Sequence, residues 1–153
     1  MENLERVLRA HPFLAGLSEQ DLEFMVGCAK NVVFKQGDFA FREGDPADDL
    51  FLLREGRLVL EVDAPGRGTV QIETLREGDV FGWSALVPPN RFDLDGRASE
   101  RTRAIAFDGR CLANKFEADP RLGYLILRRL LALLHHRLER VRLQALDVYG
   151  GGR

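Results

Sequence analysis

The sequence predicts an α+β domain: an antiparallel β-roll of the jelly-roll kind, with helices before it and a long helix after it. Residues 1–29 have helical periodicity, and residues 31–107 consist of short apolar runs separated by glycine turns. Short strands with a turn signal every 8–12 residues or so favour a roll or barrel. Residues 120–149 then carry a heptad repeat. We therefore expect a β-roll domain with its flanking helices over 1–119 and a dimerisation helix over 120–149.

The composition is that of one globular domain. The chain has 153 residues, of which 45% are hydrophobic and 30% charged, as in ordinary soluble proteins. No stretch reaches the roughly 18 apolar residues of a membrane span, and the first residues lack the apolar core of a signal peptide. We expect a cytoplasmic protein without a membrane partner.

The two cysteines give neither a disulfide framework nor a metal-binding spacing. Cys28 falls near the buried face of a predicted helix, and Cys111 falls at the start of another. Free cysteines are among the most buried residue types, so we expect two buried thiols.

The amino-terminal helices have clear boundaries. Pro12 interrupts the first helix, because proline removes a backbone donor and clashes with the preceding turn. Ser18 is a candidate N-cap for a helix over Glu19–Ala29, since its hydroxyl can accept from a free backbone N–H of the first turn.

Six strands are predicted after these helices, at 32–34, 39–41, 50–53, 58–63, 70–74 and 102–107. Turn sequences such as Gln36-Gly37-Asp38, Glu43-Gly44-Asp45-Pro46 and Glu77-Gly78-Asp79 separate them. Glycine supplies the positive φ that such turns need, and Asp or Pro shapes the neighbouring positions.

Two helices close the chain, over 109–118 and from 120 onward. Asp119 is a candidate N-cap, and Pro120 suits the first helical position. An a/d seam follows, with Tyr124, Leu127, Leu131, Leu134, Leu138, Val141 and Ala145 at alternating steps of three and four. A second stripe (Leu122, Ile126, Leu130, Leu133) can pack on the roll. A free leucine seam favours a homodimer; the alternative is a seam folded back on its own domain.

The last 33 residues carry seven arginines and two acidic residues. This basic face is either a solvated helix surface or a surface for nucleic acid or an acidic protein partner. The sequence reaches Tyr149-Gly150-Gly151-Gly152-Arg153 without room for the recognition helix of a helix-turn-helix unit. We expect no DNA reader in this chain, which is then either a stand-alone module or one truncated before a DNA-binding domain.

Several stretches together resemble the cyclic-nucleotide-binding domain of bacterial regulators of the catabolite-activator and FNR type. They are HPFLAGLSEQDLEFMV, VFKQGDFAFREGDPADDLFLLREGRLVLEV with Gly37, Gly44 and Gly56 at the turns, REGDVFGWSAL, and RAIAFDGRCL with the final helix. The resemblance covers residues 10–149 and implies a β-roll with a phosphate-binding cassette that begins at REGDVFGWSAL.

The resemblance implies a ligand site at Phe81, Gly82, Trp83, Ser84, Ala85, Arg91, Phe92 and Asp93. Gly82 permits close backbone approach, and a short helix at 84–86 presents N–H groups to an anion. The chain departs from the family at two places. Trp83 replaces the glutamate that accepts from the ribose hydroxyl, and Phe92 stands at the arginine position, with Arg91 one residue away. In another alignment Arg97-Ala98-Ser99 supplies the arginine motif; we prefer the first, which preserves the length of the next strand.

The alternatives at these positions stay open on sequence alone. Trp83 is a stacking platform for a flat ligand or an aromatic plug of the pocket, and Arg91 is an anion ligand or a solvated loop residue. We expect Arg97 to pair with Asp93 or Asp95, which lie two residues apart on a probable strand and so share a surface face.

The function predicted is that of a sensor or regulatory module. A small anionic, nucleotide-like effector, such as a cyclic nucleotide or another phosphorylated molecule, would bind the cassette and signal through the dimer helix. The alternative is a ligand-free dimeric adaptor with a plugged pocket and a protein partner. His11, His135 and His136 form no chelating set, so we expect no metal and no enzymatic activity; His135 and His136 are either solvated or face the ligand.

Overall fold

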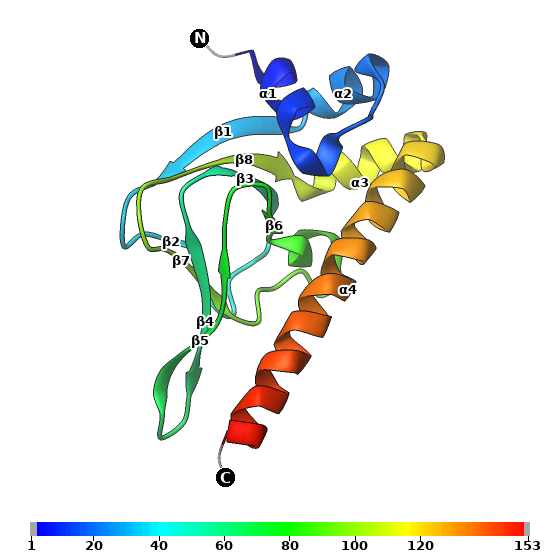
Figure 1. Ribbon diagram of the computed structural model, residues 1–153. Coiled ribbons are helices and arrows are strands. Elements are labelled where there is room, and N and C mark those ends of the chain that lie inside the picture. Colours follow the sequence, from blue (N-terminus) through cyan, green and yellow to red (C-terminus); the bar gives the residue numbers. More distant parts are fainter. Residues whose placement is uncertain (1–2, 152–153) are drawn as a thin grey trace.

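Two antiparallel sheets face each other in this computed structural model, with helices at one end and along one side (Figure 1). The structure describes residues 3–151, and side chains up to residue 146. The ends of the sequence interpretation, residues 1–2 and Gly152-Arg153, lie outside the described residues. The predicted β-roll fold, with helices before it and a long helix after it, is confirmed.

Each sheet has four strands. One runs in the order β1 (Ala29–Phe34), β8 (Thr102–Asp108), β3 (Asp49–Glu55) and β6 (Val80–Phe81). The other runs in the order β2 (Phe39–Phe41), β7 (Asp95–Ala98), β4 (Leu58–Ala64) and β5 (Gly68–Leu75). The β4–β5 hairpin extends beyond the roll (Figure 1).

Two hydrophobic clusters lie on opposite faces of the sheet that contains β3. Leu50 and Leu52 of β3 face the cluster formed with the amino-terminal helices and the last helix. Phe51 and Leu53 face the cluster between the two sheets. Successive side chains of a strand point to opposite faces, so the unbroken apolar run of β3 reflects burial on both sides.

The amino-terminal layer contains α1 (Leu4–Ala10), the short 3₁₀ helix η1 (Pro12–Leu14) and α2 (Glu19–Val26). Ser18 caps α2 as expected, since its Oγ accepts from the Asp21 N–H at 3.1 Å. α2 ends at Val26, three residues before the predicted end. Ala29 cannot remain helical because it pairs with Phe107 in the β1–β8 ladder.

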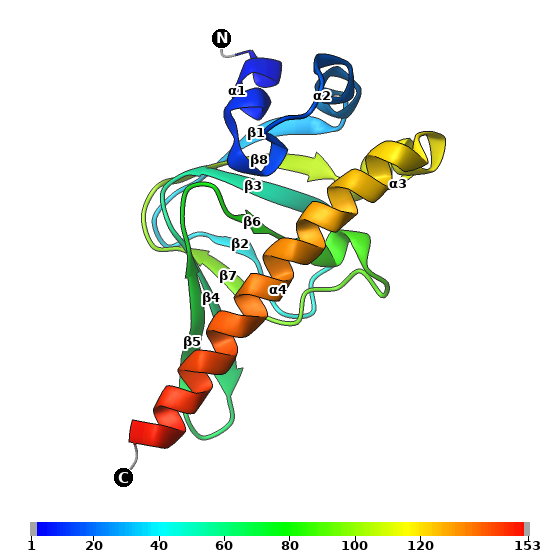
Figure 2. The ribbon, with the colours of Figure 1, turned by 45° about the vertical axis from the view of Figure 1, so that its right-hand side comes forward.

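The last two helices are α3 (Gly109–Ala118) and α4 (Pro120–Gly151). The Asp119 carboxylate accepts from the Leu122 N–H at 3.2 Å, which confirms the predicted cap. α4 runs along the roll from α3 to the β4–β5 hairpin (Figure 2). Leu122, Ile126 and Leu130 are buried against the roll, as the second apolar stripe predicts. Within residues 3–151 no helix is both long and apolar enough to cross a lipid bilayer.

Candidate functional site

The cassette begins where β6 ends, at a glycine that no other residue can replace without strain. Gly82 has a φ of 80°, in the left-handed region that glycine tolerates. A Cβ on Gly82 would lie 2.7 Å from the Asp49 carbonyl oxygen. This glycine turns the chain from β6 into the 3₁₀ helix η2 (Trp83–Leu86), at the position where the sequence predicts a short helix.

Side chains fill the interior of the cassette. Phe41 and Phe92 line a space of about 150 Å³ together with residues of the β2–β3 connection. The space beside Trp83 is about 20 Å³, and its lining includes six of the predicted ligand residues: Phe81, Gly82, Trp83, Ser84, Phe92 and Asp93. A cavity of this size holds about one water, whereas small-molecule sites occupy about 300–1,000 Å³.

Phe92 is the side chain that closes the cassette. It is 7% exposed, and its ring stacks on Phe41 with centroids 3.9 Å apart and planes 11° apart. Phe81 stacks in turn on Phe51 at 4.7 Å. The position that carries an arginine in the resembling family is therefore part of an aromatic cluster between the sheets.

The other two predicted ligand residues lie elsewhere. Ala85 and Arg91 line an open groove of about 850 Å³ together with Lys30, Arg110 and three aspartates, Asp48, Asp49 and Asp108. Arg91 Nη1 donates to the Gly44 carbonyl at 2.8 Å, so its side chain is bound to the β2–β3 connection. Burial of Asp49 and the nearby Asp108 and Asp48 raise the pKa of Asp49, although Lys30 opposes this.

Trp83 contacts a buried arginine that sequence reasoning missed. The Arg137 guanidinium lies over the Trp83 ring, 4.7 Å from its centroid, and Arg137 Nη2 donates to the Val80 carbonyl. Arg137 is 5% exposed, and burial lowers the pKa of its guanidinium, against the effect of Glu73. Arg137 continues the roll-facing stripe of α4 four residues after Leu133, so a charged residue in an apolar stripe was the available signal.

Glu73 on β5 joins this cluster. Its carboxylate lies 3.9 Å from Arg137 Nε and accepts from Arg140 Nη2 at 2.7 Å. Arg137 Nε has no hydrogen-bond partner among the described residues. The second half of α4 is thus attached to β5 and the cassette by arginines.

Two further sequence interpretations are wrong. Arg97 pairs with neither Asp93 nor Asp95; its Nε donates to Glu61 at 2.7 Å and its Nη2 at 3.3 Å. Asp95 is 9% exposed and accepts from the Glu43 N–H at 2.7 Å. The pairing of β7 with β4 brings Arg97 within reach of Glu61, and the pairing of β7 with β2 brings Asp95 close to Glu43, which follows β2.

The prediction of two free, buried thiols is also wrong. Cys28 and Cys111 form a disulfide across 83 residues of sequence. The pairing becomes possible because β1 and β8 are neighbours, with Cys28 just before β1 and Cys111 just after β8.

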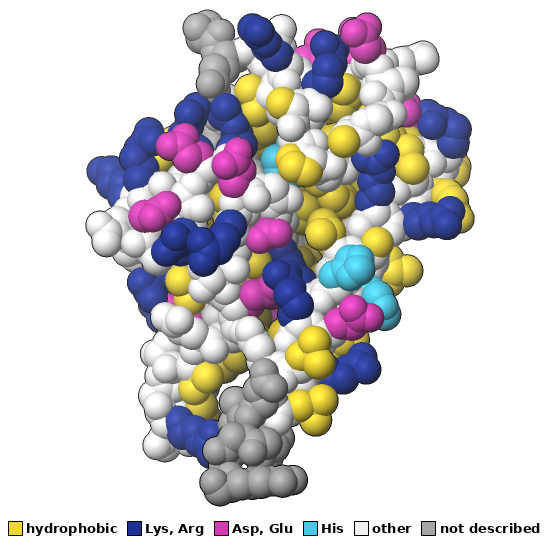
Figure 3. Space-filling model, viewed as in Figure 1, with side chains coloured by type: hydrophobic (Ala, Val, Ile, Leu, Met, Phe, Trp, Pro, Cys, Tyr) yellow, Lys and Arg dark blue, Asp and Glu magenta, His cyan; other side chains and the backbone are white. Residues whose placement is uncertain are grey.

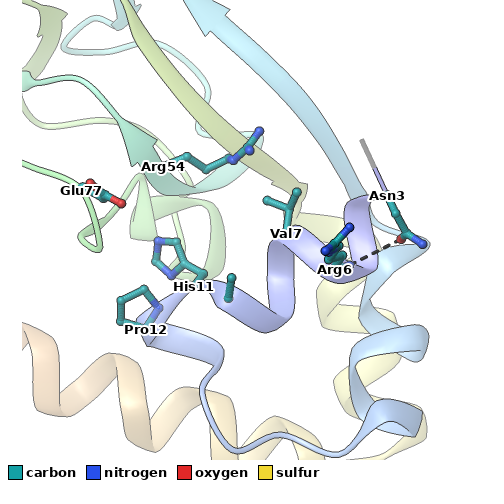
Figure 4. A pocket seen from close by; sticks show the side chains of 8 residues that line it. Asn3, Arg6, Val7, His11, Pro12, Arg54 and Glu77 are labelled. Carbon is teal, nitrogen blue, oxygen red and sulfur yellow. Dashed lines mark hydrogen bonds between the residues drawn. The ribbon is translucent and has the colours of Figure 1, made fainter. Parts of the chain in front are cut away.

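The predicted histidine sites do not reach the cassette. His135 and His136 are exposed and contact Glu139 at 3.0 and 3.9 Å. His11 is buried at another groove of about 600 Å³, where it lies between Pro12 and the loop that carries Glu77 (Figure 4). Among the residues whose side chains are described, no three His, Cys, Asp or Glu residues form a group that could hold a metal ion.

The predicted dimer seam lies mostly on the outer side of α4, where hydrophobic and charged side chains alternate (Figure 3). Leu131 is 67% exposed and Leu138 is 56% exposed. Leu134 instead packs partly against the core. The remaining seam residues divide into exposed Tyr124, Leu127 and Ala145 and half-buried Val141.

A β-roll with a glycine-led cassette and a long closing helix is the architecture of domains of the cyclic nucleotide-binding type. Residues 31–119 match the cyclic nucleotide-binding domain family, so the chain belongs to this family.

Named relatives agree with this assignment. Human cGMP-dependent protein kinase 2 is 30% identical over 87 residues; the match covers 56% of this chain and only 11% of the kinase. A putative cyclic nucleotide-binding protein from Geobacter metallireducens is similar in structure, with a TM-score of 0.79 and 28% identity over 90% of this chain and 99% of that one. The Thermus thermophilus catabolite activator protein has a TM-score of 0.71 at 24% identity, covering 91% of this chain and 63% of that protein.

Proposed function

We propose that this chain is a non-enzymatic regulatory module that acts as a homodimeric adaptor with a closed cassette. The filled cassette carries the proposal. Phe92 is stacked on Phe41, and the two spaces that these rings line are about 20 and 150 Å³, below the size of small-molecule sites. Trp83 replaces the ribose-binding glutamate that the family resemblance implies. A nucleotide would have to displace this aromatic cluster to enter.

The surface of α4 supports the dimer part of the proposal. Tyr124 is 66% exposed, Leu127 47%, Leu131 67% and Leu138 56%. Exposed apolar residues along one helix favour a protein partner, and an identical helix meets an a/d seam with matching spacing. The closed cassette contacts this helix through Trp83 and Arg137, so a shift of α4 would displace the cassette, and a change in the cassette would displace α4. A cytoplasmic location remains a prediction from the sequence.

Oligomeric state tests the dimer. The Leu131→Glu/Leu138→Glu variant places charges in the seam, and light scattering should give half the mass of the wild type. Leu143→Glu is the matched control, because Leu143 is 63% exposed on the same helix but lies outside the seam; it should remain a dimer. A double variant with wild-type mass would refute the seam.

Calorimetry tests the closed cassette. Titration with cyclic AMP and cyclic GMP should give no saturable heat at millimolar concentration, which corresponds to a free energy of binding weaker than about 4 kcal/mol. Saturable binding accompanied by a change in the emission of Trp83 would overturn the closed-cassette proposal, since Trp83 is the single tryptophan.

The groove at Ala85 and Arg91 favours a second candidate, a sensor of a small anionic effector. Its volume of about 850 Å³ admits a nucleotide-sized molecule, and Lys30, Arg91 and Arg110 are in its lining. Asp48, Asp49 and Asp108 share the lining and would repel an anion, so this candidate ranks second. A thermal-shift screen of phosphorylated metabolites tests it: a stabilising compound whose effect is lost in Arg91→Ala supports the groove, and an unchanged effect excludes Arg91.

A further inference from the structure

The Cys28–Cys111 disulfide lies at the junction of the amino-terminal layer, the roll and α3. Cys28 is in the connection between α2 and β1, and Cys111 is in the first turn of α3. Figure 1 shows α2, the ends of β1 and β8, and α3 close together at this end of the roll. The bond therefore joins the first turn of α3 to the connection before β1.

A groove gives access to the disulfide. An open space of about 700 Å³ is lined by both cysteines and by Lys30, Asp108 and Lys115. Cys28 is 7% exposed, and Cys111 is half-buried. The two lysines favour an attacking thiolate, because thiolates are stabilised by nearby positive charge, whereas Asp49 and Asp108 in the same lining oppose it.

α3 is the helix that links the disulfide to the cassette and to α4. At Gly109 a Cβ would lie 2.9 Å from the Ala85 carbonyl oxygen of η2, so the backbone of α3 lies directly against the cassette. At Gly123 of α4 a Cβ would lie 2.8 Å from the Phe116 Cβ of α3. A shift of α3 towards either neighbour would therefore require that neighbour to move.

We propose that Cys28–Cys111 is a redox-active disulfide whose reduction loosens α3 between the cassette and α4. A dithiol reductant attacks one sulfur as a thiolate, the Cys28–Cys111 bond breaks, and a mixed disulfide forms. The second thiol of the reductant then displaces that cysteine. The two cysteines together gain two electrons and two protons, and the dithiol becomes a disulfide.

Hydrogen bonds beside the disulfide make the change reversible. The Asp108 N–H donates to the Cys28 carbonyl at 3.0 Å, and the Asp108 carboxylate accepts from the Cys111 N–H at 2.9 Å. These bonds keep the two thiols near each other after reduction. Unbonded sulfur atoms nevertheless stay at van der Waals separation, so reduction moves the two side chains apart and removes the covalent link between α3 and the connection before β1.

The wild-type protein provides the first test. It is incubated with dithiothreitol under native conditions and in guanidinium chloride, then alkylated, and the alkylated cysteines are counted by mass spectrometry. An accessible disulfide should be reduced within about 100-fold of the rate in the unfolded chain. A native rate slower than this would overturn the proposal, because reduction would then require unfolding.

Hydrogen exchange and tryptophan emission test the consequence. After reduction the amides of α3 should exchange about tenfold faster, and the emission of Trp83 should change. The Cys28→Ser/Cys111→Ser variant is the control: it should resemble the reduced protein and ignore dithiothreitol. Unchanged exchange in α3 after complete reduction would overturn the proposal. The same response is expected in the Leu131→Glu/Leu138→Glu background, so failure of the dimer proposal would be distinguishable.

Discussion

Removal of the Phe92 ring should destabilise the protein far more than removal of a neighbouring exposed ring. Phe92 is 7% exposed and stacks on Phe41 at 3.9 Å. Replacement of a buried phenylalanine by alanine costs about 3–5 kcal/mol, including the cavity that remains. Phe92 lies at the end of the cassette loop, where the chain can partly relax, so we expect about 3–4 kcal/mol in the free energy of unfolding. For a chain of this length this corresponds to a decrease in Tm of roughly 6–16 °C.

Urea unfolding of Phe92→Ala, followed by circular dichroism, measures this difference. Phe39→Ala is the matched control, since Phe39 lies on β2 two residues from Phe41 and is 40% exposed. The Arg42 guanidinium lies 4.2 Å from its ring centroid, so this variant should lose about 1 kcal/mol. Equal losses in the two variants would refute the argument that Phe92 fills the cassette as a structural residue.

Two other substitutions test the polar interior. His11 Nδ1 accepts from the Phe13 N–H at 3.2 Å, and Nε2 contacts the Leu53 carbonyl at 3.0 Å; burial lowers the pKa of His11 from its ordinary value of 6.5. Folding therefore favours the neutral ring. Its contribution to the free energy of unfolding is complete above about pH 6.5 and is lost as the pH falls towards the lower pKa that His11 has in the folded protein. His11→Gln should therefore flatten the dependence of stability on pH below 6.5 or so, and parallel curves for the two proteins would contradict this. Arg97→Ala leaves the 4% exposed Glu61 carboxylate without its partner and should cost about 2–4 kcal/mol by urea unfolding. Arg9→Ala is the control: it loses a 3.2 Å contact with Glu19 between two exposed side chains and should cost less than about 1 kcal/mol. Similar losses would argue against the importance of the buried pair.

The sequence predicted those features that depend on local pattern. Glycine turns and short apolar runs predicted six of the eight strands in residues 3–151, with the short β6 and β7 outside the predicted ranges. Ser18 and Asp119 marked helix starts that the hydrogen bonds confirm. A cap or a turn involves residues within three or four positions, so one sequence contains the whole interaction.

Interactions across the sheets could not be predicted in this way. Arg97 finds Glu61 through the pairing of β7 with β4, and Cys28 finds Cys111 through the pairing of β1 with β8. Each depends on strand order, which no local spacing contains. The position of the Arg91 side chain could not be predicted for a related reason. Phe92, the next residue, lines the cassette, but the Arg91 side chain donates to the Gly44 carbonyl on another loop.

Arg137 combines a cost with a structural consequence. The buried guanidinium has no hydrogen-bond partner for Nε among the described residues. Its burial lowers the stability of the fold, because the attraction of Glu73 at 3.9 Å offsets only part of the free energy of desolvation. An apolar residue at position 137 would pack against the roll but would form no directional contact with the cassette. The arginine instead binds the Val80 carbonyl and covers Trp83, so α4 is held at the cassette by directional contacts. Such contacts break when α4 shifts, whereas apolar packing can slide. The position of α4 relative to the cassette is therefore specified by the contacts of Arg137 with Val80 and Trp83.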